Sequence, residues 1–222
     1  YNYGMFARGA KQVIVVDIDP DEHRKGTVHL DQVINADVGA FLSALPELRL
    51  REHRAWTDKC IHWKEVFPVF TPDQEDDSQG ISKFGFIRLL NQFLKRDSVV
   101  VTDAGATTEF PMQGLFYTTR QQRYIGSAEQ CEMGYALPAA VGVSIARGKR
   151  ETLCIVGDGS LQMNLQELQT CVTQKLPAKI FVWNNGGYGT IRGHQKTIFK
   201  GRFVGVDPES GTAFPPLDKI AD

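Results

Sequence analysis

From residue 81 onward, short apolar runs alternate with segments of helical periodicity. The apolar runs cover residues 98–103, 152–158 and 178–185. The helical segments cover residues 82–96, 129–147 and 162–175. Strands that alternate with helices form parallel sheets whose crossovers are right-handed. The sequence therefore predicts an α/β fold in which a doubly wound parallel sheet has helices on both faces.

The first 80 residues divide into two parts. VIVVDID, residues 13–19, predicts a buried strand that Pro20 ends, and residues 36–45 have helical spacing. We interpret residues 1–48 as the C-terminal tail of a preceding α/β domain. Residues 49–80 end in PVFTPDQEDDSQG, whose prolines and acidic residues predict a linker. Residues 81–222 then form a second domain, which we expect to be incomplete because its last residues, LDKIAD, indicate the start of a helix.

Composition excludes several classes of partner. Of the residues, 42% are hydrophobic and 23% charged, as in an ordinary globular protein, and the net charge is −1. A chain without a basic surplus is not expected to bind nucleic acid or an anionic membrane, and no apolar run approaches the roughly 20 residues of a membrane span. The four cysteines form no CxxC pair. We expect a reducing, cytoplasmic location.

Polar clusters follow three of the predicted strands. They are Asp103-Ala104-Gly105, Gly157-Asp158-Gly159-Ser160 and Asn184-Asn185-Gly186-Gly187. In parallel sheets ligands bind beyond the carboxyl ends of the strands. The glycine-flanked turn at 157–160 suits a phosphate, but the Asp158 carboxylate would repel one unless a divalent cation lay between them. Mg²⁺ takes about six oxygen ligands, commonly one or two carboxylates plus phosphate oxygens. The side chain of Asn185, one crossover later, and the Gly187 carbonyl are the other candidate ligands.

The pairing of GDG at 157–159 with NN at 184–185 resembles the signature of thiamine diphosphate-dependent enzymes. The segment EMGYALPAAVG, residues 132–142, is similar to the acetolactate synthase-like branch of that family. VVVTDAGATTEF, residues 99–110, resembles the family's other diphosphate loop, and VIVVDIDPDE resembles the last strand of its central domain. By this resemblance, residues 81–222 are the diphosphate-binding domain.

The resemblance implies a set of cofactor-binding residues. Met133 would wedge the cofactor into its bent shape, while the Cys131 carbonyl and the Met133 N–H would meet the aminopyrimidine edge. The residues implied near the diphosphate are Ala106, Thr107, Thr108, Gly157, Asp158, Gly159, Ser160, Asn185, Gly187 and Tyr188. Of these, Asp158, Asn185 and Gly187 would hold Mg²⁺. We expect Gly159 to be a glycine because a side chain there would crowd the phosphates, and we expect Asp158 and Asn185 to lie outside the core.

The resemblance also implies an activity: decarboxylation of a 2-oxo acid such as pyruvate, followed by ligation or release of the aldehyde unit. The glutamate that activates the cofactor lies on another domain, supplied by a neighbouring subunit, so we name no catalytic residue and expect a homo-oligomer, a dimer or tetramer. Some members bind FAD. Asp17 and Asp19 could contact its adenosine part, although capping a loop is the favoured role for both.

Two departures from the family pattern leave the substrate open. His194 stands where acetohydroxyacid synthases have a tryptophan, and Ala106-Thr107 replace a glutamine-histidine pair. Arg192, His194 and Lys196 either recognise a substrate carboxylate or form a solvated rim. The alternatives are therefore another thiamine diphosphate-dependent 2-oxo acid decarboxylase, or a non-catalytic domain that kept the fold. A different nucleotide-binding module lacks support, since neither G-x-G-x-x-G nor a Walker lysine is present.

Overall fold

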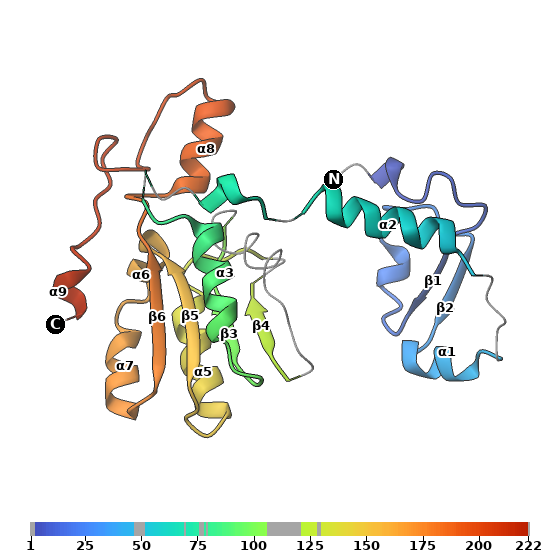
Figure 1. Ribbon diagram of the computed structural model, residues 1–222, viewed down its shortest axis with the longest axis horizontal. Helices are drawn as coiled ribbons and strands as arrows, with labels where there is room; N and C mark the ends of the chain where they lie inside the picture. Colours follow the sequence, from blue (N-terminus) through green and yellow to red (C-terminus); the bar gives the residue numbers. More distant parts are fainter. Residues whose placement is uncertain are drawn as a thin grey trace. The chain divides into compact units, whose positions relative to one another are not determined.

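The chain divides into two compact units, Tyr1–Cys60 and Ile61–Asp222 (Figure 1). The computed structural model describes residues 3–46, 52–68, 70–75, 78, 80–105, 121–127 and 130–221. The boundary between the units falls inside helix α2, Arg54–Val66. This helix and the short 3-10 turn η3, Pro72–Glu75, lie in the stretch predicted as a linker. The domain boundaries at residues 48 and 80 stay predictions.

The first unit is built around two parallel strands, β1 (Ile14–Asp17) and β2 (Gln32–Asn35), in which Val15 stands opposite Val33. Short 3-10 turns, η1 (Tyr3–Met5) and η2 (Glu22–Arg24), precede and follow β1. Helix α1, Val38–Ala44, begins where the Asp37 side chain accepts a hydrogen bond from the Ala40 N–H.

The strand predicted at 13–19 is confirmed, but its predicted burial is wrong. No β1 residue is fully buried, and Ile14 is 52% exposed, because in the described part of this unit β1 has one neighbouring strand. At the end of β1, Asp17 accepts a hydrogen bond from the Asp19 N–H, and Asp19 accepts one from the Asp21 N–H, both at 2.9 Å. The loop-capping role is thus confirmed for both aspartates.

The second unit contains a parallel sheet in the order β4-β3-β5-β6, as the sequence predicted for a doubly wound α/β fold. Its strands are β3 (Val99–Thr102), β4 (Arg123–Gly126), β5 (Thr152–Gly157) and β6 (Ala178–Trp183). Its helices are α3 (Lys83–Phe93), α5 (Ala136–Ala146), α6 (Asp158–Met163), α7 (Glu167–Gln174), α8 (Gly189–Thr197) and α9 (Asp218–Ala221).

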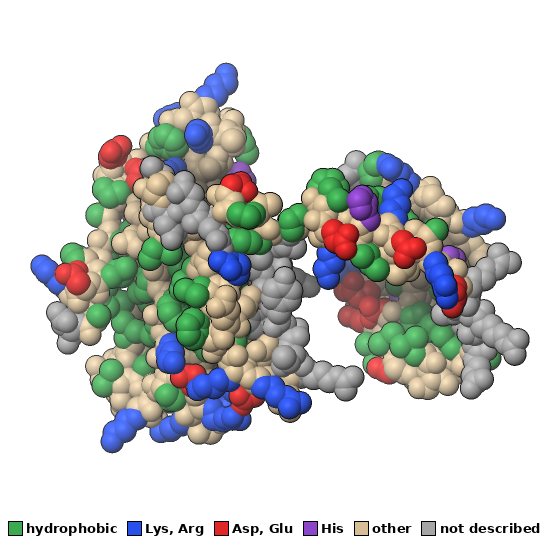
Figure 2. Space-filling view, in the orientation of Figure 1, with side chains coloured by type: hydrophobic (Ala, Val, Ile, Leu, Met, Phe, Trp, Pro, Cys, Tyr) green, Lys and Arg blue, Asp and Glu red, His purple; other side chains and the backbone are tan. Residues whose placement is uncertain are grey.

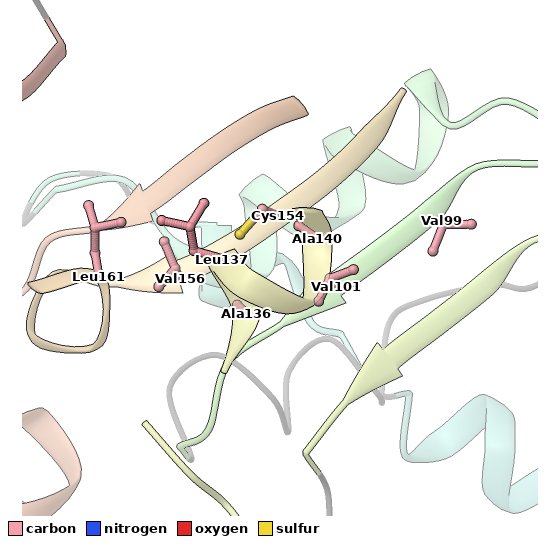
Figure 3. Close-up of a cluster of buried hydrophobic side chains, with 8 residues drawn as sticks. All are labelled: Val99, Val101, Ala136, Leu137, Ala140, Cys154, Val156 and Leu161. Carbon is pink, nitrogen blue, oxygen red and sulfur yellow. The ribbon is translucent and has the colours of Figure 1, made fainter. Parts of the chain in front are cut away.

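Helices cover both faces of this sheet because alternate strand residues point to opposite sides. On one face, Val99 and Val101 of β3 join Cys154 and Val156 of β5 in a cluster with helix α5 (Figure 3). On the other face, Val100, Leu153 and Ile155 pack with Ile87 and Leu90 of helix α3. The hydrophobic runs of β3 and β5 are therefore continuous, as is typical of strands buried on both sides.

Two predicted helices differ from the observed ones. The helix predicted over 129–147 begins only at Ala136, because Cys131 (φ 55°) and Gly134 (φ 83°) adopt left-handed backbone conformations that a helix does not contain. The helix predicted over 162–175 is two helices, α6 and α7, which are separated at residues 164–166. Helix α6 also begins four residues earlier than predicted, at Asp158 itself.

Candidate cofactor site

The carboxyl ends of β3, β5 and β6 surround a cavity of about 310 Å³. Nine of the residues predicted to bind a cofactor line it: Cys131, Met133, Gly157, Asp158, Gly159, Ser160, Asn185, Gly187 and Tyr188. The other three, Ala106, Thr107 and Thr108, lie outside the described residues. The structure also places Ala104, Gly105, Gly189, Thr190 and Ile191 at this cavity. The last three belong to the first turn of α8, a helix that the sequence reading missed.

Asp158 joins two of these strand ends. One carboxylate oxygen, Oδ1, accepts a hydrogen bond from the Gly159 N–H at 2.8 Å, and the other, Oδ2, accepts one from the Gly187 N–H at 3.0 Å. The side chain therefore ties the β5–α6 turn to the loop after β6. We expected Asp158 to lie outside the core, but it is only 5% exposed. That expectation was wrong because the loops beyond the strand ends fold over the carboxylate.

The other two candidate ligands of a cation have neutral oxygens. Asn185 is exposed at the cavity, and its backbone carbonyl accepts a hydrogen bond from the Arg192 guanidinium at 3.2 Å. The Gly187 carbonyl accepts one from the Gly189 N–H at 3.1 Å. Within the described residues no three His, Cys, Asp or Glu side chains converge on one point. A cation in this cavity would therefore have Asp158 as its carboxylate ligand from the described chain and neutral oxygens beside it.

Two glycines of the cavity leave no room for a side chain. At Gly187, whose φ is 151°, a Cβ would lie 2.1 Å from the Val206 carbonyl oxygen. At Gly159 a Cβ would lie 2.5 Å from the Tyr188 ring and 3.3 Å from Phe214. We expected Gly159 to be required by the approach of phosphates. The structure shows a different neighbour, since the Tyr188 ring already occupies the space beside it.

Asp103 is a residue of this region to which sequence reasoning assigned no role. It directly follows β3, is fully buried, and accepts hydrogen bonds from the Ala104 N–H at 2.8 Å and the Gly134 N–H at 3.2 Å. Burial raises the pKa of its carboxyl group, against the opposing effect of these backbone donors. Through Gly134 it positions the segment that carries Cys131 and Met133. The signal in the sequence was the same as for Asp158, namely an aspartate that follows a buried strand.

The segment around Gly134 is also attached to the break between α6 and α7. The Asn164 side chain donates to the Gly134 carbonyl at 2.6 Å. A Cβ at Gly134 would lie 2.8 Å from the Asn164 amide nitrogen and 2.9 Å from the Met163 Cβ. Asn164 lies in the break between α6 and α7. This interruption of the helix predicted over 162–175 therefore supplies a side chain that holds the segment around Met133 and Gly134.

The cations after β6 do not converge on the cavity. Arg192 is turned toward the loop backbone, and its Nε lies 3.9 Å from the Asp207 carboxylate. His194 and Lys196 are exposed on α8 and are not among the described residues that line the cavity. Of the two interpretations open from the sequence, the described geometry favours a solvated rim for His194 and Lys196. Arg192 has a third role, as a partner of the loop that carries Asn185.

The two edges of the sheet differ in charge. The amino-terminal edge carries Lys95, Arg147, Arg150 and Lys179, which pair with Asp97 and Glu151 (Figure 2). Lys179 and then Lys95 lower the pKa of Glu151. The carboxyl-terminal edge instead places the carboxylates of Asp103 and Asp158 next to backbone N–H groups. A site with acidic side chains and backbone donors suits a ligand that brings a cation together with anionic groups.

Comparison with known protein families identifies the class of this domain. Residues 103–222 match the family model described as "Thiamine pyrophosphate enzyme, C-terminal TPP binding domain". The matched residues include Asp103 and all twelve of the predicted cofactor-binding positions. The chain therefore belongs to the thiamine pyrophosphate enzyme family and contains its C-terminal cofactor-binding domain.

Several acetolactate synthases are similar to the chain over most of its length. The chain is 32% identical over 218 residues to the acetolactate synthase large subunit of Porphyra purpurea, a match that covers 95% of the chain and 35% of that protein. It is 34% identical over 226 residues to an acetolactate synthase of Arthrospira platensis, covering 98% of the chain and 37% of that protein. The chain thus spans about a third of the length of these relatives, and it is similar to them over most of its own length. None of the described helices combines the length and apolar character needed to span a membrane.

Proposed function

We propose that the cavity binds the diphosphate of thiamine diphosphate through Mg²⁺, with Asp158, Asn185 and the Gly187 carbonyl as protein ligands of the ion. The observation that carries the proposal is the Asp158 carboxylate, buried yet directed to a cavity whose wall contains the Gly159 and Gly187 amides. Each of its oxygens has one hydrogen bond and keeps a lone pair for a cation. The donor set, a carboxylate with neutral oxygens, is the kind that Mg²⁺ accepts.

The other residues of the cavity would orient the cofactor. Cys131 and Met133 line the cavity, and Asp103 and Asn164 fix their segment through hydrogen bonds with Gly134. Thiamine diphosphate, when bound, supplies a carbanion centre that attacks the carbonyl carbon of a 2-oxo acid and stabilises the charge left by loss of CO₂. The chain's own contribution is to bind and orient this group.

A calorimetric titration tests the proposal. Thiamine diphosphate is titrated into the full-length protein with and without Mg²⁺, for the wild type and for Asp158→Ala, Asn185→Ala and Gln169→Ala. We expect Asp158→Ala to abolish Mg²⁺-dependent binding and Asn185→Ala to weaken it less, because water can replace a neutral oxygen. Gln169 is the matched control, because this exposed amide on α7 contacts Thr173 of its own helix and is not among the described cavity residues. Undiminished binding in a folded Asp158→Ala variant would contradict the proposal.

We further propose that the whole protein is an enzyme that decarboxylates a 2-oxo acid such as pyruvate and ligates or releases the aldehyde unit. The support is the similarity to acetolactate synthases. We also propose a homo-oligomer, a dimer or tetramer in which the activating glutamate comes from another domain, and FAD in the whole protein stays a hypothesis. None of the four cysteines, all of which lie in the described part of the chain, forms a disulfide, and we propose a reducing, cytoplasmic location.

Turnover separates this activity from its alternatives. We expect the full-length protein to consume pyruvate and form acetolactate when it is supplied with thiamine diphosphate and Mg²⁺. Consumption with release of free aldehyde would indicate a decarboxylase rather than a carboligase. Tight cofactor binding without consumption of any 2-oxo acid would indicate a non-catalytic domain that kept the fold.

A further inference from the structure

The loop that carries Asn185 and Gly187 is held by two other segments of the second unit. Arg192, on α8, donates from Nη2 to the Asn185 carbonyl at 3.2 Å, and its Nε lies 3.9 Å from Asp207 Oδ2. Twenty residues beyond the loop, the Val206 carbonyl accepts a hydrogen bond from the Tyr188 N–H at 2.9 Å and fills the space where Gly187 lacks a side chain. The loop is therefore enclosed by residues distant from it in sequence.

Asp207 is held in position by hydrogen bonds from Ser210, independently of its contact with Arg192. Its Oδ1 accepts hydrogen bonds from the Ser210 N–H at 2.9 Å and from the Ser210 hydroxyl at 2.6 Å. These bonds, first the one from the hydroxyl, lower the pKa of Asp207, so the carboxyl group is ionised at neutral pH. The neighbouring Val206 is 1% exposed, which anchors the turn in the interior. The carboxylate that faces Arg192 is thus a fixed charge.

The Arg192 guanidinium connects this fixed charge to the loop. Its Nε is buried and makes no hydrogen bond within the described residues, so its position depends on the attraction of Asp207 and on the bond to Asn185. Neither Arg192 nor Asp207 is among the described residues that line the cofactor cavity. Any effect of the pair on a bound ion must therefore pass through the backbone of the loop.

We infer that Arg192 and Asp207 are positioning residues that hold the Asn185–Gly187 loop in the geometry with which it meets the divalent cation. The inference rests on the proposed function of that loop. A rigid set of ligands favours Mg²⁺, which demands near-ideal octahedral geometry, over the larger Ca²⁺, which accepts flexible sites. Residues that orient metal ligands typically change metal affinity 10–100-fold when they are replaced. The pair therefore sets both the affinity of the site and its preference for Mg²⁺.

The test uses the full-length protein, four single variants and the double variant Arg192→Gln/Asp207→Asn. Arg192→Gln removes the guanidinium, and Asp207→Asn removes the charge while keeping an oxygen that can accept from Ser210. Arg202→Gln and Glu209→Gln are matched controls, because both residues are exposed in the same segment and have no side-chain partner in the described chain. Mg²⁺ and then Ca²⁺ are titrated by calorimetry at saturating thiamine diphosphate, and thermal unfolding is recorded for each protein.

We expect each of the two test variants to weaken Mg²⁺ binding by about 10-fold or more and to reduce the Mg²⁺/Ca²⁺ preference. The double variant should be no weaker than the more affected single variant, because the two residues act as one unit. Both controls should match the wild type. If the wild type itself shows no Mg²⁺-dependent binding, the proposed function fails. If the wild type binds but the test variants match the controls, or lose thermal stability with an unchanged Mg²⁺/Ca²⁺ preference, the inference alone is overturned.

Discussion

The ends of β1 and β5 have similar sequences, VVDID and IVGDG, but different surroundings. β1 belongs to the first unit, in which no described residue is fully buried. β5 has strands on both sides and helices over both faces, and its residues 152–156 are all buried. Asp17, after the first run, caps a local loop, whereas Asp158, after the second, joins two loops at a cavity. The same local pattern thus yields a turn in one unit and a candidate cation ligand in the other, because the number of packed layers differs.

The largest effect should come from adding a side chain to the enclosed loop of the second unit. Gly187→Ala would place a Cβ 2.1 Å from the Val206 carbonyl oxygen, so the loop or the Val206 segment must move. We expect a loss of more than about 3 kcal/mol of unfolding free energy. Gly186→Ala is the matched control: its φ of 69° is also left-handed, but nothing lies within 4 Å, so about 1 kcal/mol is expected. Denaturant unfolding of both variants checks this, and equal losses would contradict the geometry.

A smaller effect should distinguish the strands of the two units directly. Val156→Ala removes two buried carbons from β5, at a site that is 0% exposed, and should cost about 2–3 kcal/mol of local stability. Val15→Ala makes the same chemical change in β1, where the side chain is only half-buried, and should cost less than about 1 kcal/mol. Hydrogen–deuterium exchange of the backbone amides in each strand measures the two losses separately. Similar losses in both strands would show that β1 is more deeply packed than described.

The smallest effect concerns two aspartates that should respond to pH with opposite signs. Burial raises the pKa of Asp103 above its usual 3.8, so its contribution to stability is present below pH 3.8 and is lost as pH rises through the folded-state value. The Val13 N–H, which donates to Asp31 at 2.7 Å, is the main cause of the lowered pKa of that residue. Its contribution is present above pH 3.8 and is lost as pH falls through the folded-state value.

Denaturant unfolding over a pH series, with Asp103→Asn and Asp31→Asn, checks these signs. The stability of the wild type relative to Asp103→Asn should fall as pH rises, and its stability relative to Asp31→Asn should rise. If both stability differences instead rose with pH, Asp103 would be better solvated than its burial indicates.

The sequence by itself determined the fold class and most of the candidate site. The alternation of apolar runs and helical segments was sufficient to predict the parallel sheet, since both patterns can be recognised in short stretches of sequence. The positions of Asp158 and Asn185 one crossover apart were sufficient to bring them to one edge, because parallel strands place their carboxyl ends together. Nine of the predicted residues accordingly line one cavity. Their binding of a cofactor stays a prediction.

Only the tertiary structure decided which residues support that site. Nothing local marks Arg192, Asp207 or Val206 as neighbours of the Asn185 loop, because the contacts that hold it join residues 7 to 19 positions apart, across helix α8 and the chain after it. The sequence likewise did not determine how deeply each strand is buried. β1 and β5 have similar hydrophobicity, yet only β5 is covered on both faces. The physical reason is that secondary structure and strand-end placement follow from local periodicity, whereas burial and loop support depend on which distant segments pack there.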